Sequence, residues 1–365
     1  MFQIDRRFFQ NISWSLILLT FILTAFGLME IFSATYTYNS FLYFKKQLIW
    51  WGISICGMIF FMCFNYQILK EYAYILYALT LILLVLVLII GKKSMGAQRW
   101  LNLGFINFQP SELLKLTTIV IIAKYFDEIQ ENRSFTLIEL LKPVIMVLIP
   151  VLLVIKQPDL GSGLLILFVA VSMFLFVGIK KSTFIKILIF SVIFIPFSWH
   201  FLKDYQKKRI LTFIFPERDP LGAGYHIIQS KIAIGSGKIF GKGYLKGTQN
   251  KLAFLPEHHT DFIFSVIGEE LGLIGCLLLI FVFFLFLVNG LNIAKNSKDS
   301  FGSLLVVGIM FLFFWQFFIN IGMVIGLLPV VGIPLPFISY GGTSLFISYC
   351  LVGLVLNVNM RRFLF

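Results

Sequence analysis

The sequence predicts an all-α polytopic integral membrane protein with about ten transmembrane helices. Hydrophobic residues make up 59% of the 365 residues and charged residues only 13%, whereas a soluble domain averages about a quarter charged. A soluble chain of this length could not bury so much apolar surface in one core. Many apolar runs also approach or exceed the ~20 residues that cross a ~30 Å hydrocarbon layer. The solvent around these runs is therefore lipid.

Ten apolar runs account for the predicted spans. Solid runs are typical of membrane helices, because membrane strands show alternation instead. No repeat or soluble domain interrupts them, so residues 1–365 are predicted to form one membrane domain. Seven runs are long and continuous: 13–32, 48–64, 72–90, 184–201, 262–288, 302–328 and 342–357. Three are shorter or interrupted: 111–126, 143–155 and 163–177.

The distribution of positive charge orients this predicted bundle. Arg6 and Arg7 precede the first run, and no signal-peptide cleavage site follows it. With the N-terminus inside and ten spans, both termini are cytoplasmic, and the cytoplasmic segments carry most of the Lys and Arg of the short loops. This agrees with the positive-inside rule. Residues 203–261, between the seventh and eighth spans, then form a long extracytoplasmic loop.

The long loop is strongly basic and contains a Gly-rich stretch, 235–243. It fits either a solvated loop beside anionic lipid or an electrostatic funnel for an anionic ligand. Its length and turn signals favour function. Backbone N–H groups around Lys238 and Lys242 suit phosphate oxygens, although no P-loop motif is present. Residues 227–234 are predicted to form a short amphipathic helix on the membrane surface.

Two polar interruptions between predicted spans carry candidate site residues. Glu112 and Lys115 lie three residues apart after Pro110, so a helix that starts there places them on one face within hydrogen-bonding reach. Ionisable groups in a membrane are functional candidates, but a structural ion pair fits equally well. Asp159, in the Gly- and Pro-marked turn 157–163, is predicted to cap the following helix. A cavity-facing position is the alternative.

Asp261 lies where the long loop meets the apolar run 262–288. A carboxylate at that boundary is partly desolvated, which favours its use as a general base. The alternative is that Asp261 or Thr260 only caps the helix. Glu269 and Glu270 follow roughly 12 Å deeper at 1.5 Å per residue. Buried acids there require partners that the sequence does not identify.

The last polar interruption, 329–342, contains three prolines and three glycines, which forbid a continuous helix. We expect it to fold back into the outer mouth of the bundle. The hydroxyls of Ser339 and Ser344 would then contact a sugar or a pyrophosphate. The alternative is a rigid turn between two helices.

Six short motifs, in one order along nearly the whole chain, resemble those of the SEDS family of membrane glycan polymerases. Several motifs in one order are far more specific than any single motif. They are GAQRWL at 96–101, FQPSELLK at 108–115, QPDLG at 157–161, DPLGAGY at 219–225, LPEHHTDF at 255–262 and PFISYGG at 336–342. FPERDP at 215–220 and KGTQ at 246–249 resemble the RodA (rod shape-determining) branch more than FtsW, the division paralogue. His258 is assigned no role, because family members carry other residues there.

The resemblance implies ten transmembrane helices and an enzyme that polymerises lipid II on the outer face of the bacterial cytoplasmic membrane during cell elongation. It implies that Asp261 is the essential acid, and it maps the family's Glu and Lys onto Glu112 and Lys115. The implied partners are a class B penicillin-binding protein, which is a monofunctional transpeptidase, and elongation-complex membrane proteins. No nucleic acid is implied.

The implied reaction is an inverting glycosyl transfer from an undecaprenyl-diphosphate-linked glycan strand to lipid II. Asp261 would deprotonate the GlcNAc 4-hydroxyl as it attacks the anomeric carbon, which gives a β-1,4 link. Arg99 and loop lysines such as Lys242 would stabilise the leaving diphosphate. A divalent cation, Mg²⁺ or Mn²⁺, is compatible with phosphates, but the four cysteines lie in apolar runs and no multi-histidine cluster indicates a metal site.

Three other functions remain open. A lipid II flippase would also have ten spans and broken helices, but it needs charged groups near the midplane rather than an essential base at one surface. A non-catalytic scaffold that recruits the transpeptidase would tolerate Asp261→Asn. Within the family, a division polymerase like FtsW is the alternative.

Overall fold

The computed structural model describes residues 11–36, 40–94, 97–102, 107–129, 134–198, 200, 204–219, 222–248 and 260–362. Within them, eight helices are long and apolar enough to cross a membrane. Two further long helices, α6 (Pro110–Ile129) and α9 (Lys181–Ser198), occupy the remaining predicted spans. The protein is therefore an all-α polytopic membrane protein, as its sequence predicts. Arg6, Arg7 and His258 lie outside the described residues.

The other helices follow the predicted runs in order. The first four are α2 (Trp14–Thr35), α3 (Ser40–Cys63), α4 (Gln67–Glu71) and α5 (Ala73–Ile90). The middle of the chain forms α7 (Leu137–Lys156), α8 (Leu160–Val177), α10 (Asp204–Ile214), the 3-10 helix η2 (Pro216–Arg218) and α11 (Ala223–Gly237). The last three are α13 (Ile263–Lys295), α14 (Ser300–Val324) and α15 (Gly342–Met360).

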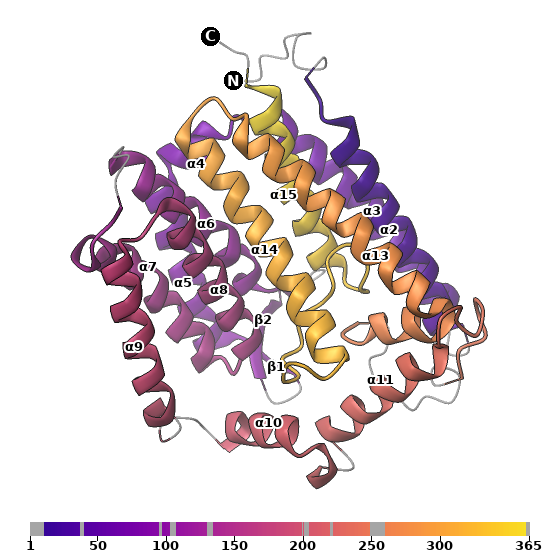
Figure 1. The fold of residues 1–365 in the computed structure, drawn as a ribbon. Coiled ribbons are helices and arrows are strands. Elements are labelled where there is room, and N and C mark those ends of the chain that lie inside the picture. The colour runs from indigo at the N-terminus through magenta and orange to yellow at the C-terminus, as the bar shows by residue number, and fades with distance from the viewer. Residues whose placement is uncertain are drawn as a thin grey trace.

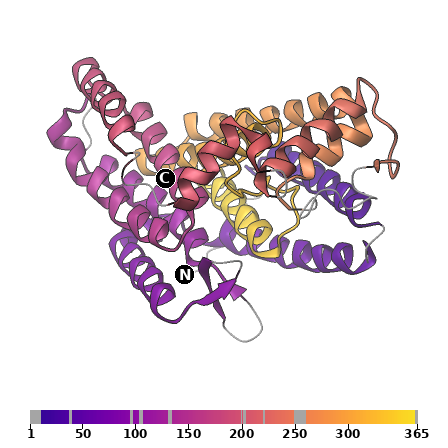
Figure 2. The same cartoon turned by 90° about the horizontal axis from the view of Figure 1, so that it is seen from below.

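Both described ends of the chain lie at one end of the bundle, here named the terminal end (Figure 1). The side-chain amide of Asn359 donates to the backbone oxygen of Asn11 at 2.6 Å. The opposite end, named the site end, carries α10 and α11, which lie across the ends of the bundle helices (Figure 2). Ends that meet on one side require an even number of crossings, which agrees with the ten long helices of the described residues.

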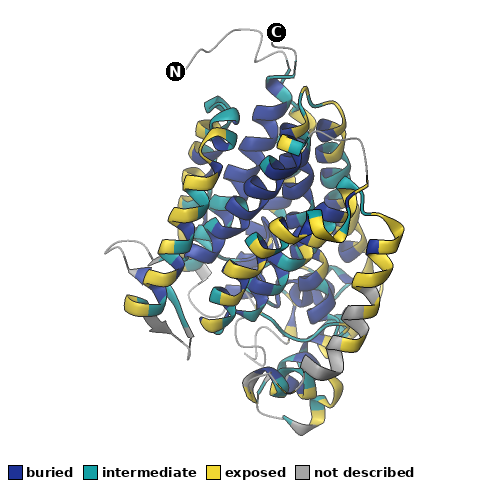
Figure 3. Cartoon of the chain, turned by 90° about the vertical axis from the view of Figure 1, so that its left-hand side faces the viewer, coloured by how far each residue is buried: buried dark blue, intermediate teal, exposed yellow. Residues whose placement is uncertain are grey.

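The interior and the periphery of the bundle are both apolar. One large cluster of buried hydrophobic residues runs through the helices (Figure 3). Among the described candidate spans, α14 and α15 are the most buried. The outward faces nevertheless expose large apolar side chains such as Ile138 (84%) and Phe41 (72%). Soluble monomers rarely expose apolar patches of this extent, so these faces contact lipid. Close packing relies on small residues: a Cβ on Gly353 of α15 would lie 2.5 Å from the Met58 backbone oxygen of α3.

The long loop predicted between the seventh and eighth spans, and the segment after α5, contain more regular structure than the sequence indicates. A three-stranded antiparallel sheet is formed by β1 (Lys92–Ser94), β2 (Ala97–Asn102) and β3 (Asn107–Phe108). The helix predicted over 227–234 is confirmed but longer, as α11. In both segments, backbone N–H and C=O groups must form hydrogen bonds with one another wherever water is excluded. Strands and short helices provide these hydrogen bonds within each segment.

The predicted continuous span 262–288 is broken at Gly272, where φ is 67°. A Cβ at this position would lie 2.3 Å from the Gly241 nitrogen, so only glycine fits. The segment after α11 pairs with the break, since the Leu273 amide donates to the Lys238 oxygen and the Gly243 amide to the Glu270 oxygen, both at 2.9 Å. The part of α13 before Gly272 is therefore a separate, buried half-helix that begins beside Asp261.

Candidate active site

A polar cavity of about 270 Å³ lies at the site end of the bundle. Its walls come from β2, the first turns of α6 and α8, the turn before α13, and the segment that enters α15. Among its lining residues are five of the seven residues that the sequence predicts for the site: Arg99, Glu112, Lys115, Asp261 and Ser344. Residues far apart in the chain thus meet around one space.

Glu112 and Lys115 form an ion pair on α6, with 2.5 Å between Oε1 and Nζ. Their predicted proximity on one helix face is confirmed. Both side chains are almost fully buried, at 12% and 4% exposure, and both line the cavity. The two interpretations left open by the sequence therefore coincide: the pair neutralises two buried charges and also faces the space where a ligand would bind.

Asp159, at the start of α8, contacts residues of the two neighbouring cavity walls, β2 and the start of α6. Its carboxylate accepts from the Ser162 amide at 3.3 Å, which confirms the predicted cap. It also accepts from the Gln109 side chain at 3.2 Å and lies 3.8 Å from the Arg99 guanidinium. Arg99 donates in addition to the Pro158 carbonyl. Asp159 thus caps a helix and lines the cavity at once, and it fixes a cation over that cavity.

Asp261 is partly buried in the turn that precedes α13. Across the cavity wall it meets Gly332, because a Cβ on that glycine would lie 3.2 Å from Asp261 Oδ2. The φ of Gly332 is +73°, which also favours glycine. The Asp261 backbone oxygen accepts from the Asn320 side chain at 3.0 Å. Asp261 therefore lies at one end of the bundle, in contact with an open cavity, as a surface base requires.

Two predicted substrate contacts lie elsewhere. Ser339 is buried, and its hydroxyl donates to the Thr260 oxygen at 2.6 Å and accepts from the Leu335 amide at 2.8 Å. Lys242 binds Glu269 at 2.7 Å and Thr248 at 2.8 Å. Neither side chain is among the residues that line the cavity. The Ser339 hydroxyl is thus already bonded to backbone groups, and the Lys242 ammonium is bonded to a buried acid. The sequence does not reveal either contact.

The structure supplies the partners of the buried acids Glu269 and Glu270. Glu269 pairs with Lys242 and accepts from the Thr248 amide at 2.8 Å. Glu270 accepts from the Ser33 hydroxyl of α2 at 2.6 Å and from the Leu245 amide at 2.9 Å. Both acids therefore fasten residues 242–248 and α2 to the break in α13.

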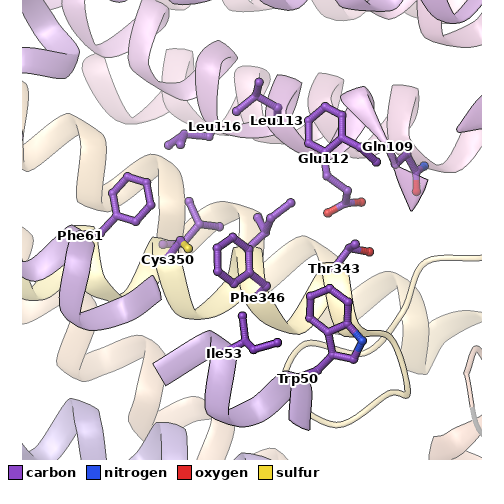
Figure 4. A pocket seen from close by; sticks show the side chains of 13 residues that line it. Trp50, Ile53, Phe61, Gln109, Glu112, Leu113, Leu116, Thr343, Phe346 and Cys350 are labelled. Atoms are coloured by element: carbon purple, nitrogen blue, oxygen red, sulfur yellow. The ribbon is translucent and has the colours of Figure 1, made fainter. Parts of the chain in front are cut away.

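An apolar groove of about 490 Å³ adjoins the polar cavity between α3, α6 and α15 (Figure 4). Gln109, Glu112 and Thr343 belong to both spaces. The sequence does not predict this groove, because apolar side chains of membrane helices look alike whether they face lipid, core or groove. The remaining lining residues are apolar: Trp50, Ile53, Phe61, Phe108, Leu113, Leu116, Phe346, Ile347, Cys350 and Leu351.

Several polar residues at the site were also missed. Gln109 belongs to a quoted motif, and Thr343 follows another, so proximity to a motif could have indicated both. Asn320 is an isolated amide in an apolar run, and a polar side chain within a membrane helix is itself a functional signal. Among the described residues, no group of three or more His, Cys, Asp or Glu side chains is placed to hold a metal ion.

This geometry can be compared with known proteins. The model of the cell cycle protein family that comprises FtsW, RodA and SpoVE matches residues 13–363. The chain belongs to this family. The polar cavity and the ten long helices of its described residues are thus features of an FtsW/RodA/SpoVE protein, the family that the motifs resemble under the name SEDS.

Three curated relatives illustrate the range of the FtsW/RodA/SpoVE family. Peptidoglycan glycosyltransferase MrdB of Escherichia coli K12 is 44% identical over 299 residues, which are 81% of this chain and 80% of the relative. A probable peptidoglycan glycosyltransferase FtsW of Trichlorobacter lovleyi is 39% identical over 98% of this chain and 96% of its own. Stage V sporulation protein E of Bacillus subtilis is 37% identical over 94% and 96%, respectively.

Solved structures share the fold of this family member. A chain from a peptidoglycan synthase complex, described as coordinating polymerization and crosslinking, matches with a TM-score of 0.84 at 29% identity over 97% of this chain and 99% of that chain. The rod shape-determining protein RodA of Thermus thermophilus matches with a TM-score of 0.72 at 26% identity over 96% and 98%.

Proposed function

We propose that the protein is a peptidoglycan glycosyltransferase that polymerises lipid II into β-1,4-linked glycan strands at the outer face of the cytoplasmic membrane. One observation carries the proposal: Asp261 shares a polar cavity with Arg99 and Lys115, and this cavity adjoins an apolar groove between membrane helices. The curated relatives support it, since by name MrdB is a peptidoglycan glycosyltransferase and FtsW is a probable one.

The two adjoining spaces fit an amphiphilic substrate. Lipid II combines sugars and a diphosphate with a long isoprenoid chain. The polar cavity suits the sugars and the diphosphate, because it holds fixed cations and hydrogen-bonding groups. The apolar groove suits the isoprenoid, which loses contact with water or disordered lipid when it packs against aromatic and aliphatic side chains. Glu112 and Thr343, which border both spaces, mark the junction between head and chain.

The reaction is an inverting displacement. Asp261 accepts the proton of the GlcNAc 4-hydroxyl of the incoming lipid II, and the oxygen bonds to the anomeric carbon of the growing strand. The bond from that carbon to the diphosphate oxygen breaks, and undecaprenyl diphosphate leaves with the electron pair. Attack from the opposite face turns the α-linked donor into a β-1,4 product. The proton then passes from Asp261 to solvent.

Two cations of the cavity stabilise the leaving diphosphate. Arg99 is held by Asp159 and the Pro158 carbonyl, so its guanidinium needs little reorganisation as charge develops. Lys115 is held by Glu112. No step is assigned to Mg²⁺ or Mn²⁺.

The proposed topology and partners follow from the same assignment. The terminal end, with both chain ends, faces the cytoplasm, and the site end faces outward, as the positive-inside rule expects. The structural match to a complex that couples polymerization and crosslinking supports a class B penicillin-binding protein as partner. Similarity to the rod shape-determining protein RodA favours a role in cell elongation. Residues 1–365 are proposed to form a single SEDS-type transmembrane domain.

The decisive experiment measures glycan chains formed from labelled lipid II by the purified protein, alone and with its cognate transpeptidase. The wild type should form long chains, and Asp261→Asn should reduce the rate at least ~100-fold, because removal of a general base typically costs 10²–10⁴. Asp204→Asn, an exposed change in the first turn of α10, is the matched control. Transport of lipid II across vesicles without polymer would instead identify a flippase. Full activity of Asp261→Asn would identify a different base.

A further inference from the structure

The backbone that carries Asp261 is held by two buried side chains. The hydroxyl of Ser339 donates to the carbonyl oxygen of Thr260 at 2.6 Å. The amide of Asn320 donates to the carbonyl oxygen of Asp261 at 3.0 Å. Two consecutive carbonyls, at the position where the half-helix of α13 begins, are therefore each bonded to a side chain from another part of the chain.

Each of these side chains makes a second bond to the same segment, 333–339. The Asn320 amide also donates to the Ile333 oxygen at 2.8 Å. The Ser339 hydroxyl accepts from the Leu335 amide at 2.8 Å. Asn320 is completely buried, and its Oδ1 has no hydrogen-bond partner within the described part of the chain. Asn320 therefore acts through its amide N–H donors, which link the turn at Asp261 to the segment 333–339.

The segment 333–339 is itself rigid. Phe337 has a φ of 66°, which is unusual for a residue other than glycine. Its ring packs against Phe286 and Phe313, with centroids 5.3 and 5.2 Å away. On the other side, a Cβ on Gly27 of α2 would lie only 2.5 Å from the Ile338 Cα. Packing on both faces holds a backbone conformation that would otherwise be unfavourable.

We propose that Asn320 and Ser339 are positioning residues, which clamp the Thr260 and Asp261 carbonyls to the rigid segment 333–339 and so fix the Asp261 carboxylate at the cavity. This inference rests on the proposed function of Asp261 as a base. A base must be within hydrogen-bonding reach of the proton it removes, and a displacement of about 1 Å can cost about 100-fold in rate. The clamp prevents such a displacement without occupying the cavity.

Four variants test the clamp by kinetics. Asn320→Leu and Ser339→Ala remove the donors, whereas Ser339→Thr keeps the hydroxyl and serves as the conservative rescue. Thr118→Ala, also a buried hydroxyl in the bundle, is the matched control. We expect kcat to fall about 10- to 100-fold in Asn320→Leu and in Ser339→Ala, with KM for lipid II changed less than about threefold. Ser339→Thr should stay within about threefold of wild type.

A second measurement does not depend on activity. Amide hydrogen exchange of peptides that cover 260–265 and 333–339 should accelerate in Asn320→Leu and Ser339→Ala, and not in Thr118→Ala. Unchanged exchange in both variants would overturn the clamp, as would unchanged kcat in folded protein that polymerises normally. If the wild type formed no polymer, the proposed function would fail, and exchange alone would still decide whether the clamp exists.

Discussion

Glu112 and Lys115 are paired at 2.5 Å on one face of α6, and the same pair lines the cavity that Asp261 borders. One turn of helix thus brings two opposite charges to the cavity side of a wall of the bundle. Because Lys115 is 4% exposed, its ammonium depends on Glu112 for compensation. Stability and the proposed function would therefore both depend on this pair, and variants that remove one charge or both separate the two effects.

Single and double changes at this pair should have different effects. Glu112→Gln leaves a buried ammonium without its partner and should lower the free energy of unfolding by about 3 kcal/mol. Glu112→Leu combined with Lys115→Met replaces the pair with apolar groups and should restore most of that stability, while polymerisation stays low because the cavity has lost a cation. Thermal unfolding in detergent and lipid II polymerisation measure the two effects. Recovery of activity in the double variant would exclude a role of the charges in substrate binding.

Lys242 should behave as a structural residue. Its partner Glu269 has a side chain that is 1% exposed, so Lys242→Met leaves a buried carboxylate without its cation and destabilises the protein by up to ~3–5 kcal/mol. We expect the melting temperature to fall while the apparent KM for lipid II, measured on folded protein, is unchanged. This reverses the expectation of an electrostatic funnel at Lys242. A raised KM with unchanged melting temperature would restore the funnel. Lys208→Met, which removes an exposed lysine of α10, is the control.

Filling the apolar groove should discriminate substrates by chain length. Ile347→Trp adds a bulky ring between α3 and α15, where Ile347 borders the groove. The KM for lipid II with a full undecaprenyl chain should rise several-fold, because the ring displaces isoprenoid units from their apolar contacts. The KM for an analogue with a short chain should change little. Ile280→Trp, on the outward face of α13, is the control. Equal effects on both substrates would remove the groove from chain binding.

The sequence alone determined the membrane class, the order of the spans and the local relationships at the site. Apolar runs define helices wherever lipid is the solvent, because each helix satisfies its own backbone. The pairing of Glu112 with Lys115 and the cap at Asp159 were also predictable, since residues three apart on a helix are neighbours. The sequence also placed Asp261 at the boundary between the long loop and a span, because the apolar run 262–288 begins directly after it.

Only the tertiary structure decided which polar groups meet. Gly241 packs against Gly272 and breaks α13, which turns Lys242 toward Glu269 and away from the cavity. Asn320 donates to the backbone oxygen of Asp261 from 59 positions away, and Ser339 donates to that of Thr260 from 79 positions away. Sequence patterns show the period of a helix and the ends of an apolar run. They carry no information about contacts between residues so far apart in the chain. Such contacts arise when buried donors find acceptors because unpaired polar groups are costly away from water.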